Sequence, residues 1–260
     1  MNHSSSYALI TGASSGIGAD FARVLAGMGI NLILVARREA LLKELAHELQ
    51  HQHGVSAHLL SMDLTQRGSA ENIFRYCQDN ALRVDFLINN AGFGTLGEFT
   101  GIDWENESSM IDLNIKVLVE LSKLFGRSMA LKGFGRIMNV ASVAAFLPGP
   151  GFAVYFASKA FVLSFSESIA AELRCKGVTV TALCPGPTKS EFGSTSGAGN
   201  TKLFELGLAP SLVVAKYGIR SMMRGKTVAI QGVQNKLLVW VVARITPNAL
   251  LSRIIFRLNR

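Results

Sequence analysis

A glycine-rich turn near the N-terminus constrains the fold of this 260-residue chain more than any other feature. The apolar run 7–11 leads into a turn containing Gly12, Gly16 and Gly18, and a helical pattern follows to about Met28. Glycine lets a backbone approach a pyrophosphate closely, and a helix N-terminus offers free N–H groups at the positive end of its dipole. This unit predicts a dinucleotide-binding turn, although its spacing, Gly-x-x-x-Gly-x-Gly, differs from the commoner Gly-x-Gly-x-x-Gly.

Short apolar runs alternate with helical patterns along most of the chain. This alternation predicts a parallel sheet with right-handed crossovers. A hydrophobic content of 49% and a charged content of 17% suit parallel strands that are buried on both faces. Further strands are expected at 31–36, 55–62, 85–88, 135–140, 178–184 and 227–231, and helices at 38–53, 69–80, 104–131, 152–176 and 211–224.

The end of the second strand bears on the choice of dinucleotide. An acidic residue at this place would bind the ribose 2′-hydroxyl of NAD(H). Here the strand ends at Ala36, and Arg37 and Arg38 follow. Because a guanidinium fork suits a 2′-phosphate, the sequence favours NADP(H). The alternative is that the two arginines merely end a strand.

A tyrosine and a lysine in the second half of the chain form a candidate proton-transfer pair. Tyr155 and Lys159 stand four residues apart in a predicted helix and therefore lie on one face. A nearby ammonium favours the ionised phenol, so we expect a lowered pKa for Tyr155. Ser142, just beyond the strand 135–140, is placed to hold a carbonyl or hydroxyl against that phenol. By itself, Tyr-x-x-x-Lys also fits two residues on a solvated helix face.

Other features exclude several classes of protein. Three widely separated cysteines form neither a disulfide framework nor a zinc spacing, and no apolar segment precedes the first strand, so a cytoplasmic protein is expected. No apolar run reaches the ~18 residues that a transmembrane helix needs. His47 and His51 lack further ligands, and no metal site is predicted.

The last 25 residues, 236–260, contain five basic residues and no acidic one, within a chain of net charge +8. After an apolar run at 237–243, Thr246 and Pro247 resemble a helix start, and an apolar stripe with arginines largely off it follows. A basic amphipathic helix is typical of a membrane-surface contact. Packing on its own domain or on a second subunit is the alternative. We therefore divide the chain into a dinucleotide-binding domain, residues 1–235, and a tail, 236–260.

Taken together, these motifs resemble those of the classical short-chain dehydrogenase/reductase (SDR) family. The resemblance rests on residues 11–18, 89–92 and 185–188, and on Asn114, Ser142 and the Tyr155/Lys159 pair, in the family's order. It covers residues 7 to 188, and more loosely extends to about Gly232. It implies a single doubly wound Rossmann sheet of about seven strands and hydride transfer from a nicotinamide. The protein would then be a carbonyl reductase that interconverts a ketone or aldehyde and an alcohol.

The resemblance also implies residue roles. Tyr155 would be the general acid/base, Lys159 would lower its pKa and hold the nicotinamide ribose, Ser142 would polarise the substrate, and Asn114 would anchor a relay water. Asp63 would meet the adenine and Thr188 the carboxamide. The full predicted NADP(H)-binding set is Gly12, Ser14, Ser15, Gly16, Ile17, Gly18, Arg37, Arg38, Asp63, Leu64, Asn90, Ala91, Gly92, Tyr155, Lys159, Pro185, Gly186 and Thr188.

The substrate, the partners and two other classes of function remain to be considered. Residues 188–210 resemble the family's substrate lid, and apolar residues flanking it (Phe192, Leu203, Phe204, Leu206 and Leu208) favour an apolar substrate. The family also implies a homo-oligomer. A catalytically silent NADP(H)-binding protein is the main alternative, although the set of catalytic residue types is complete. Nucleic-acid binding is not predicted, because the excess charge lies largely in the tail and no aromatic-basic platform accompanies it.

Overall fold

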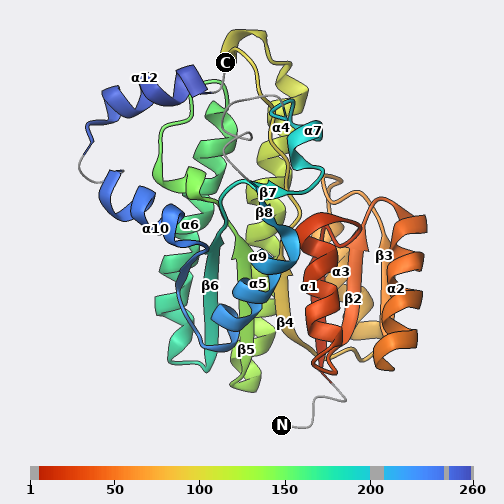
Figure 1. Ribbon diagram of the computed structural model, residues 1–260. Helices are drawn as coiled ribbons and strands as arrows, with labels where there is room; N and C mark the ends of the chain where they lie inside the picture. Colours follow the sequence, from red (N-terminus) through yellow and green to blue (C-terminus); the bar gives the residue numbers. More distant parts are fainter. Residues whose placement is uncertain (1–5, 200–207, 243–245, 259–260) are drawn as a thin grey trace.

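Seven parallel strands form the central sheet of the protein, seen here in a computed structural model (Figure 1). The structure describes residues 6–199, 208–242 and 246–258. The strand order is β3-β2-β1-β4-β5-β6-β9, and every pair in it is parallel. The order reverses between β1 and β4, the switch point at which open α/β sheets bind ligands. The strands are β1 Tyr7–Thr11, β2 Asn31–Ala36, β3 Ala57–Ser61, β4 Val84–Asn89, β5 Gly135–Val140, β6 Val178–Cys184 and β9 Val228–Ile230.

Helices cover both faces of this sheet, as the predicted buried strands require. One hydrophobic cluster joins the sheet to α1, α2 and α9, and a second joins its other face to α3, α5 and α6. Every residue of β4 is buried, in keeping with a strand at the middle of a doubly covered sheet. The predicted Rossmann-type fold is confirmed. The helices are α1 Gly16–Ala26, α2 Glu39–His53, α3 Ser69–Asp79, α5 Leu118–Lys132, α6 Ala153–Arg174 and α9 Ser211–Met223.

The helix predicted over 104–131 differs from expectation in its middle. It begins as α4, Trp104–Ile111, and continues into α5 through a π-helical segment, η2, over Asp112–Val117. Asn114 lies inside this segment. π-Bulges within α-helices occur frequently at functional sites. Asparagine has a low helix propensity, but the sequence contains no sign of the change in winding.

The region predicted as a lid loop is partly regular. A two-stranded parallel sheet pairs β7, Thr188–Lys189, with β8, Ala209–Pro210, and one helical turn, α7, spans Phe192–Thr195. We call residues 188–199 the lid segment. The predicted apolar flank at Leu203, Phe204 and Leu206 lies outside the described residues.

The tail forms short helices, of which α12 stands at the upper left of Figure 1. Val239 is buried in a cluster with residues of α6 and β9, and Leu251 of α12 is buried as well. This burial fits the alternative in which the tail packs on its own domain. Leu250 and Ile254 are exposed, so membrane contact and the division at residue 235 stay predictions. The elements are α10 Val233–Leu237, the π-helical η4 Leu238–Val242 and α12 Asn248–Leu258.

Within the described ranges, no helix is both long and apolar enough to cross a bilayer. Nor do any three histidine, cysteine, aspartate or glutamate side chains there come close enough together to hold a metal ion.

Phe21 offers a direct test of the packing between α1 and α9. Its side chain is fully buried, and its ring edge would lie 3.1 Å from a β-carbon built on Gly218. We expect Phe21→Ala to lower the free energy of unfolding by about 3–5 kcal/mol, because truncation leaves a cavity in close-packed surroundings. Phe99→Ala is the matched control: the Phe99 side chain is 66% exposed, and a change within about 0.5 kcal/mol is expected. If urea denaturation showed the same loss of unfolding free energy for both variants, the assignment of Phe21 to the core would be contradicted.

Candidate active site

The glycine-rich turn after β1 is tied to the end of β4. The Asn90 side-chain amide donates to the carbonyls of Thr11 and Gly12 at 3.0 and 3.3 Å, and the Thr11 hydroxyl accepts from the backbone N–H groups of Asn90 and Ala91. Gly12 has a positive φ of 66°, and a β-carbon on it would lie 2.9 Å from the Asn90 amide nitrogen. A β-carbon on Gly18 would overlap the Gly12 carbonyl oxygen. The two glycines therefore allow the turn, α1 and the end of β4 to meet.

Three of the four predicted catalytic residues meet beyond the C-terminal ends of β5 and β6. Ser142 follows β5 and caps the 3₁₀ turn η3, Val143–Phe146, where its hydroxyl accepts from the Ala144 N–H at 3.1 Å. That hydroxyl also donates to the Pro185 carbonyl at 3.5 Å, and it lies near enough to the Tyr155 phenol to lower the pKa of that phenol. The Lys159 ammonium lies 5.7 Å from the centroid of the Tyr155 ring and donates to the Val140 carbonyl at 2.9 Å.

Asn114, the fourth predicted catalytic residue, contacts the loop after β4 and helix α6. Its side chain forms a closed pair with the backbone of Phe93, accepting from the N–H at 3.1 Å and donating to the carbonyl at 2.9 Å. The same amide donates to the Ser158 hydroxyl on α6 at 3.1 Å. A β-carbon on Gly92 would lie 2.8 Å from the Asn114 amide oxygen and 3.4 Å from the Lys159 nitrogen. The missing side chain at Gly92 thus lets the π-helical segment approach α6.

Aromatic rings surround the phenol of Tyr155. The ring centroids of Phe152 and Phe156 each lie 6.0 Å from that of Tyr155, and the centroid of Phe192 lies at 5.2 Å. Phe152 and Phe156 belong to a small buried cluster against which Tyr155 packs. The surroundings of the phenol are therefore largely apolar.

Burial sets the proton affinities of the central pair. It raises the pKa of Tyr155 to about 12, with the Ser142 hydrogen bond opposing the rise. It also lowers the pKa of the Lys159 ammonium to about 8. The predicted lowering of the Tyr155 pKa is therefore wrong in direction, because removal of the phenol from water outweighs the opposing effect of Ser142. With this pKa, Tyr155 is a neutral phenol at neutral pH, which is the form that can donate a proton.

The residues predicted for the adenosine end lie at the ends of β2 and β3. Asp63 accepts from the backbone N–H and hydroxyl of Thr65 at 2.9 and 2.8 Å; these bonds, and then the charge of Arg37, lower the pKa of its carboxyl. Leu64 is buried beside it. Among the described residues, the Arg37 side chain forms no hydrogen bond or ion pair.

The segment after β6 closes the other side of the site. The Pro185 carbonyl accepts from the backbone N–H of Val143 at 3.0 Å. A β-carbon on Gly186 would meet the side chain of Asn235, so this turn packs closely against α10. Thr188 is buried, and its hydroxyl donates to the Gly186 carbonyl at 2.8 Å. The predicted 185–188 motif therefore packs between the turn that follows Ser142 and helix α10.

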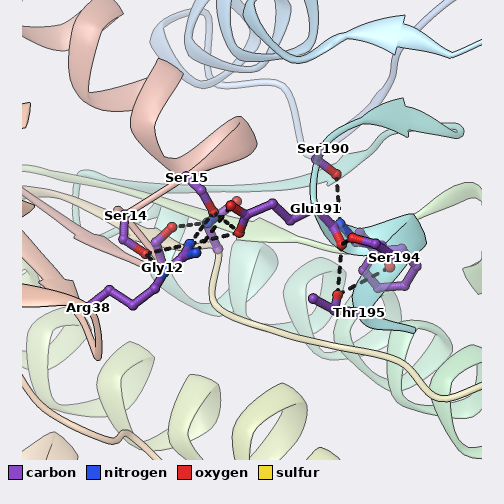
Figure 2. A network of polar contacts seen from close by, with 10 residues as sticks. Gly12, Ser14, Ser15, Arg38, Ser190, Glu191, Ser194 and Thr195 are labelled. Atoms are coloured by element: carbon purple, nitrogen blue, oxygen red, sulfur yellow. Dashed lines mark hydrogen bonds and ion pairs between the residues drawn. The ribbon is translucent and has the colours of Figure 1, made fainter. Parts of the chain in front are cut away.

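One residue at this site was not identified from the sequence. Glu191, in the lid segment, binds Arg38 and Ser15 near the glycine-rich turn (Figure 2). Its Oε2 lies 2.8 Å from an Arg38 nitrogen. The two residues are far apart in the chain, and no local pattern distinguishes Glu191 from an ordinary solvated glutamate. Phe192, which the sequence analysis named among the apolar residues flanking the lid, packs on Tyr155.

Comparison with known proteins places this arrangement in a family. Residues 6–200 match the family model described as short chain dehydrogenase. Sulfoacetaldehyde reductase 2 of Chromohalobacter salexigens is 38% identical over 186 residues, which is 71% of this chain and 73% of that protein.

Two solved structures are similar over nearly the whole chain. A short-chain dehydrogenase from Sphingobium yanoikuyae in complex with NADPH aligns with a TM-score of 0.83 and 31% identity, covering 95% of each chain. The bulky-bulky ketone specific alcohol dehydrogenase from Comamonas testosteroni aligns with a TM-score of 0.78 and 29% identity, covering 92% of each. The chain belongs to the short-chain dehydrogenase family of oxidoreductases.

Proposed function

We propose that this protein is an NADP(H)-dependent oxidoreductase that interconverts an apolar ketone or aldehyde and the corresponding alcohol. The observation that carries the proposal is the convergence of the Ser142 hydroxyl and the Lys159 ammonium on the phenol of Tyr155. When bound, the nicotinamide cofactor supplies the hydride. The protein's own residues hold the carbonyl oxygen, exclude water and deliver the proton.

The proton path follows from the contacts of Tyr155. In carbonyl reduction, the neutral phenol donates its proton to the oxygen on which negative charge develops, and the Ser142 hydroxyl hydrogen-bonds to that oxygen. The Lys159 ammonium, while protonated, stabilises the phenolate that the transfer leaves behind. Asn114 holds its place through Phe93 and Ser158, so we assign it to positioning α4–α5 against α6.

The choice of NADP(H) rests on charge at the end of β2. Arg37 and Arg38 stand where NAD(H) enzymes of this fold carry an acidic residue. The NADPH complex of the Sphingobium yanoikuyae relative supports the same cofactor. Among the described residues, the Arg37 side chain has no hydrogen bond or ion pair to give up, and it is therefore available to a 2′-phosphate.

The substrate class is proposed from the rings around Tyr155. Phe152, Phe156 and Phe192 surround the phenol, and Leu96 and Leu147 pack against the same cluster. Such a lining suits a hydrophobic carbonyl compound. The ketone specificity of the Comamonas testosteroni relative supports this class, whereas the name of the Chromohalobacter salexigens relative refers to an anionic aldehyde. A homo-oligomer stays a prediction.

A substrate screen tests the proposal as a whole. NADPH oxidation should be followed with aliphatic ketones, steroid-like ketones, acyl ketones and sulfoacetaldehyde. We expect the highest kcat/KM among the apolar ketones. Binding of NADPH without turnover on any member would favour a catalytically silent NADP(H)-binding protein. A preference for sulfoacetaldehyde would contradict the proposed substrate class.

Replacement of Tyr155 tests the proton donor. Tyr155→Phe keeps the ring and its aromatic contacts but removes the transferable proton. A positioned general acid contributes about 100- to 10,000-fold, so we expect at least a hundredfold loss of turnover with NADPH binding largely kept. Near wild-type single-turnover rates, measured where hydride transfer limits the reaction, would exclude Tyr155 as the donor.

Replacement of Arg37 tests the cofactor preference. A charge-assisted hydrogen bond to a phosphate contributes about 1.5–3 kcal/mol. Arg37→Ala should therefore raise the Kd of NADPH by about tenfold to a hundredfold and leave the Kd of NADH nearly unchanged. Lys43→Ala, which removes an exposed cation from α2, is the control and should affect neither cofactor. Equal weakening of both cofactors by Arg37→Ala would show that Arg37 does not read the 2′-phosphate.

A further inference from the structure

Arg38 differs from Arg37 in that its guanidinium is already engaged. Its Nε donates to the Ser14 hydroxyl at 3.3 Å, Nη1 donates to Glu191 Oε1 at 3.1 Å, and Nη2 donates to Glu191 Oε2 at 2.8 Å. The same Nη2 lies 2.7 Å from the Ser15 hydroxyl. Each nitrogen of the guanidinium therefore has at least one acceptor, and Glu191 occupies the fork formed by Nη1 and Nη2. A phosphate that binds in this fork must displace that carboxylate.

The displaceable acceptor is the carboxylate of Glu191. Besides the two-pronged contact with Arg38, it accepts from the Ser15 hydroxyl at 2.9 Å, as Figure 2 shows. Arg38 is one of the two arginines from which we expect a bound 2′-phosphate to receive its hydrogen bonds, and Ser15 belongs to the predicted cofactor-binding set. A carboxylate on a guanidinium fork and a hydroxyl is a close chemical counterpart of a phosphate in that position. Hydrogen bonds from Arg38 and Ser15 lower the pKa of the Glu191 carboxyl, so it is ionised at neutral pH.

Glu191 also connects this contact to the catalytic end of the site. Ser190, just before it, lies against the glycine-rich turn: its Cβ is 3.1 Å from a β-carbon built on Gly16. Phe192, just after it, packs on the ring of Tyr155, and its ring edge comes within 3.0 Å of a β-carbon built on Gly94. Three consecutive residues of the lid segment thus span from the phosphate-binding turn to the proton donor.

We propose that Glu191 is a cofactor-specificity residue that competes with the 2′-phosphate of NADPH for Arg38 and thereby links cofactor binding to release of the lid segment. This inference rests on the NADP(H) preference proposed above. Arg37 receives the phosphate first, because its side chain has no hydrogen bond or ion pair among the described residues to lose. The phosphate then binds Arg38 as well. Glu191 withdraws because its carboxylate would face a phosphate with two negative charges where it had faced the single positive charge of Arg38.

The same geometry predicts a different response to NADH. A cofactor that has a 2′-hydroxyl brings no anion to Arg38, so the ion pair with Glu191 persists and the lid segment stays fastened. The ion pair is also modest in strength, because about half of each side chain is exposed and solvent screens the attraction. It can therefore delay NADPH without preventing its binding.

Two adenosine probes isolate this exchange from catalysis. Adenosine 2′,5′-bisphosphate carries the 2′-phosphate, AMP does not, and neither contains a nicotinamide. Their Kd values should be measured by titration calorimetry on the full-length protein, on Glu191→Gln and on the control Glu172→Gln, which changes an exposed glutamate near the far end of α6. We expect Glu191→Gln to tighten adenosine 2′,5′-bisphosphate about threefold to tenfold and to leave AMP within about twofold. Glu172→Gln should change neither Kd.

A second pair of variants identifies Arg38 as the contested group. In an Arg38→Ala background, Glu191→Gln should no longer tighten adenosine 2′,5′-bisphosphate, because the carboxylate has lost the partner for which it competes. Glu191→Asp keeps the charge but shortens the side chain, so it should tighten the same probe in part. This variant replaces Glu191→Gln if the amide form does not fold.

The outcomes separate this inference from the proposed function. If Glu191→Gln changes the Kd of adenosine 2′,5′-bisphosphate by less than twofold, or weakens both probes, the competition is refuted and the NADP(H) preference stands. Weakening of both probes would mean that Glu191 clamps a bound nucleotide. If the wild-type protein binds adenosine 2′,5′-bisphosphate no more tightly than AMP, the NADP(H) preference itself fails.

Discussion

The buried ammonium of Lys159 is the constraint on which the rest of the site depends. Only 5% of this residue is exposed, and a charged group in such a place needs a partner. The Val140 carbonyl at the end of β5 accepts its hydrogen bond, and the Tyr155 ring lies beside it. Because Gly92 has no side chain, the amide of Asn114 can approach the same spot. The end of a strand, a helix face and a π-helical segment are thereby fixed around one cation.

Burial shifts the pKa values of Lys159 and Tyr155 in opposite directions and so gives them different roles. The ammonium of Lys159 becomes easier to deprotonate, while the phenol of Tyr155 becomes harder to ionise. A neutral phenol is the form required to protonate a developing alkoxide, and a charged ammonium is the form required to stabilise the phenolate. The site is therefore suited to reduction at pH values at which Lys159 still holds its proton. The lid segment adds Phe192 to the apolar surroundings that produce the shift in Tyr155.

Much of the fold and site could be predicted because its signals are local. The turn at Gly12 needs a positive φ, the strands are apolar runs, and Tyr155 and Lys159 share a helix face by spacing alone. What could not be predicted depends on contacts between distant residues. The π-helical winding at Asn114 accompanies capture of its amide by Phe93 and Ser158. The raised pKa of Tyr155 arises from packing, and Glu191 acquires its role only from Arg38, 153 residues away.

The pH dependence of reduction tests the role of buried Lys159 most directly. The kcat/KM for NADPH reports ionisations of the free enzyme. Because Lys159 has a pKa lowered to about 8 and is needed in its charged form, kcat/KM should fall as the pH rises through about 8. In Lys159→Arg the guanidinium keeps its proton in this range, so that decline should be absent from whatever activity remains. A wild-type profile that stays level up to pH ~10, or the same decline in both proteins, would contradict this account.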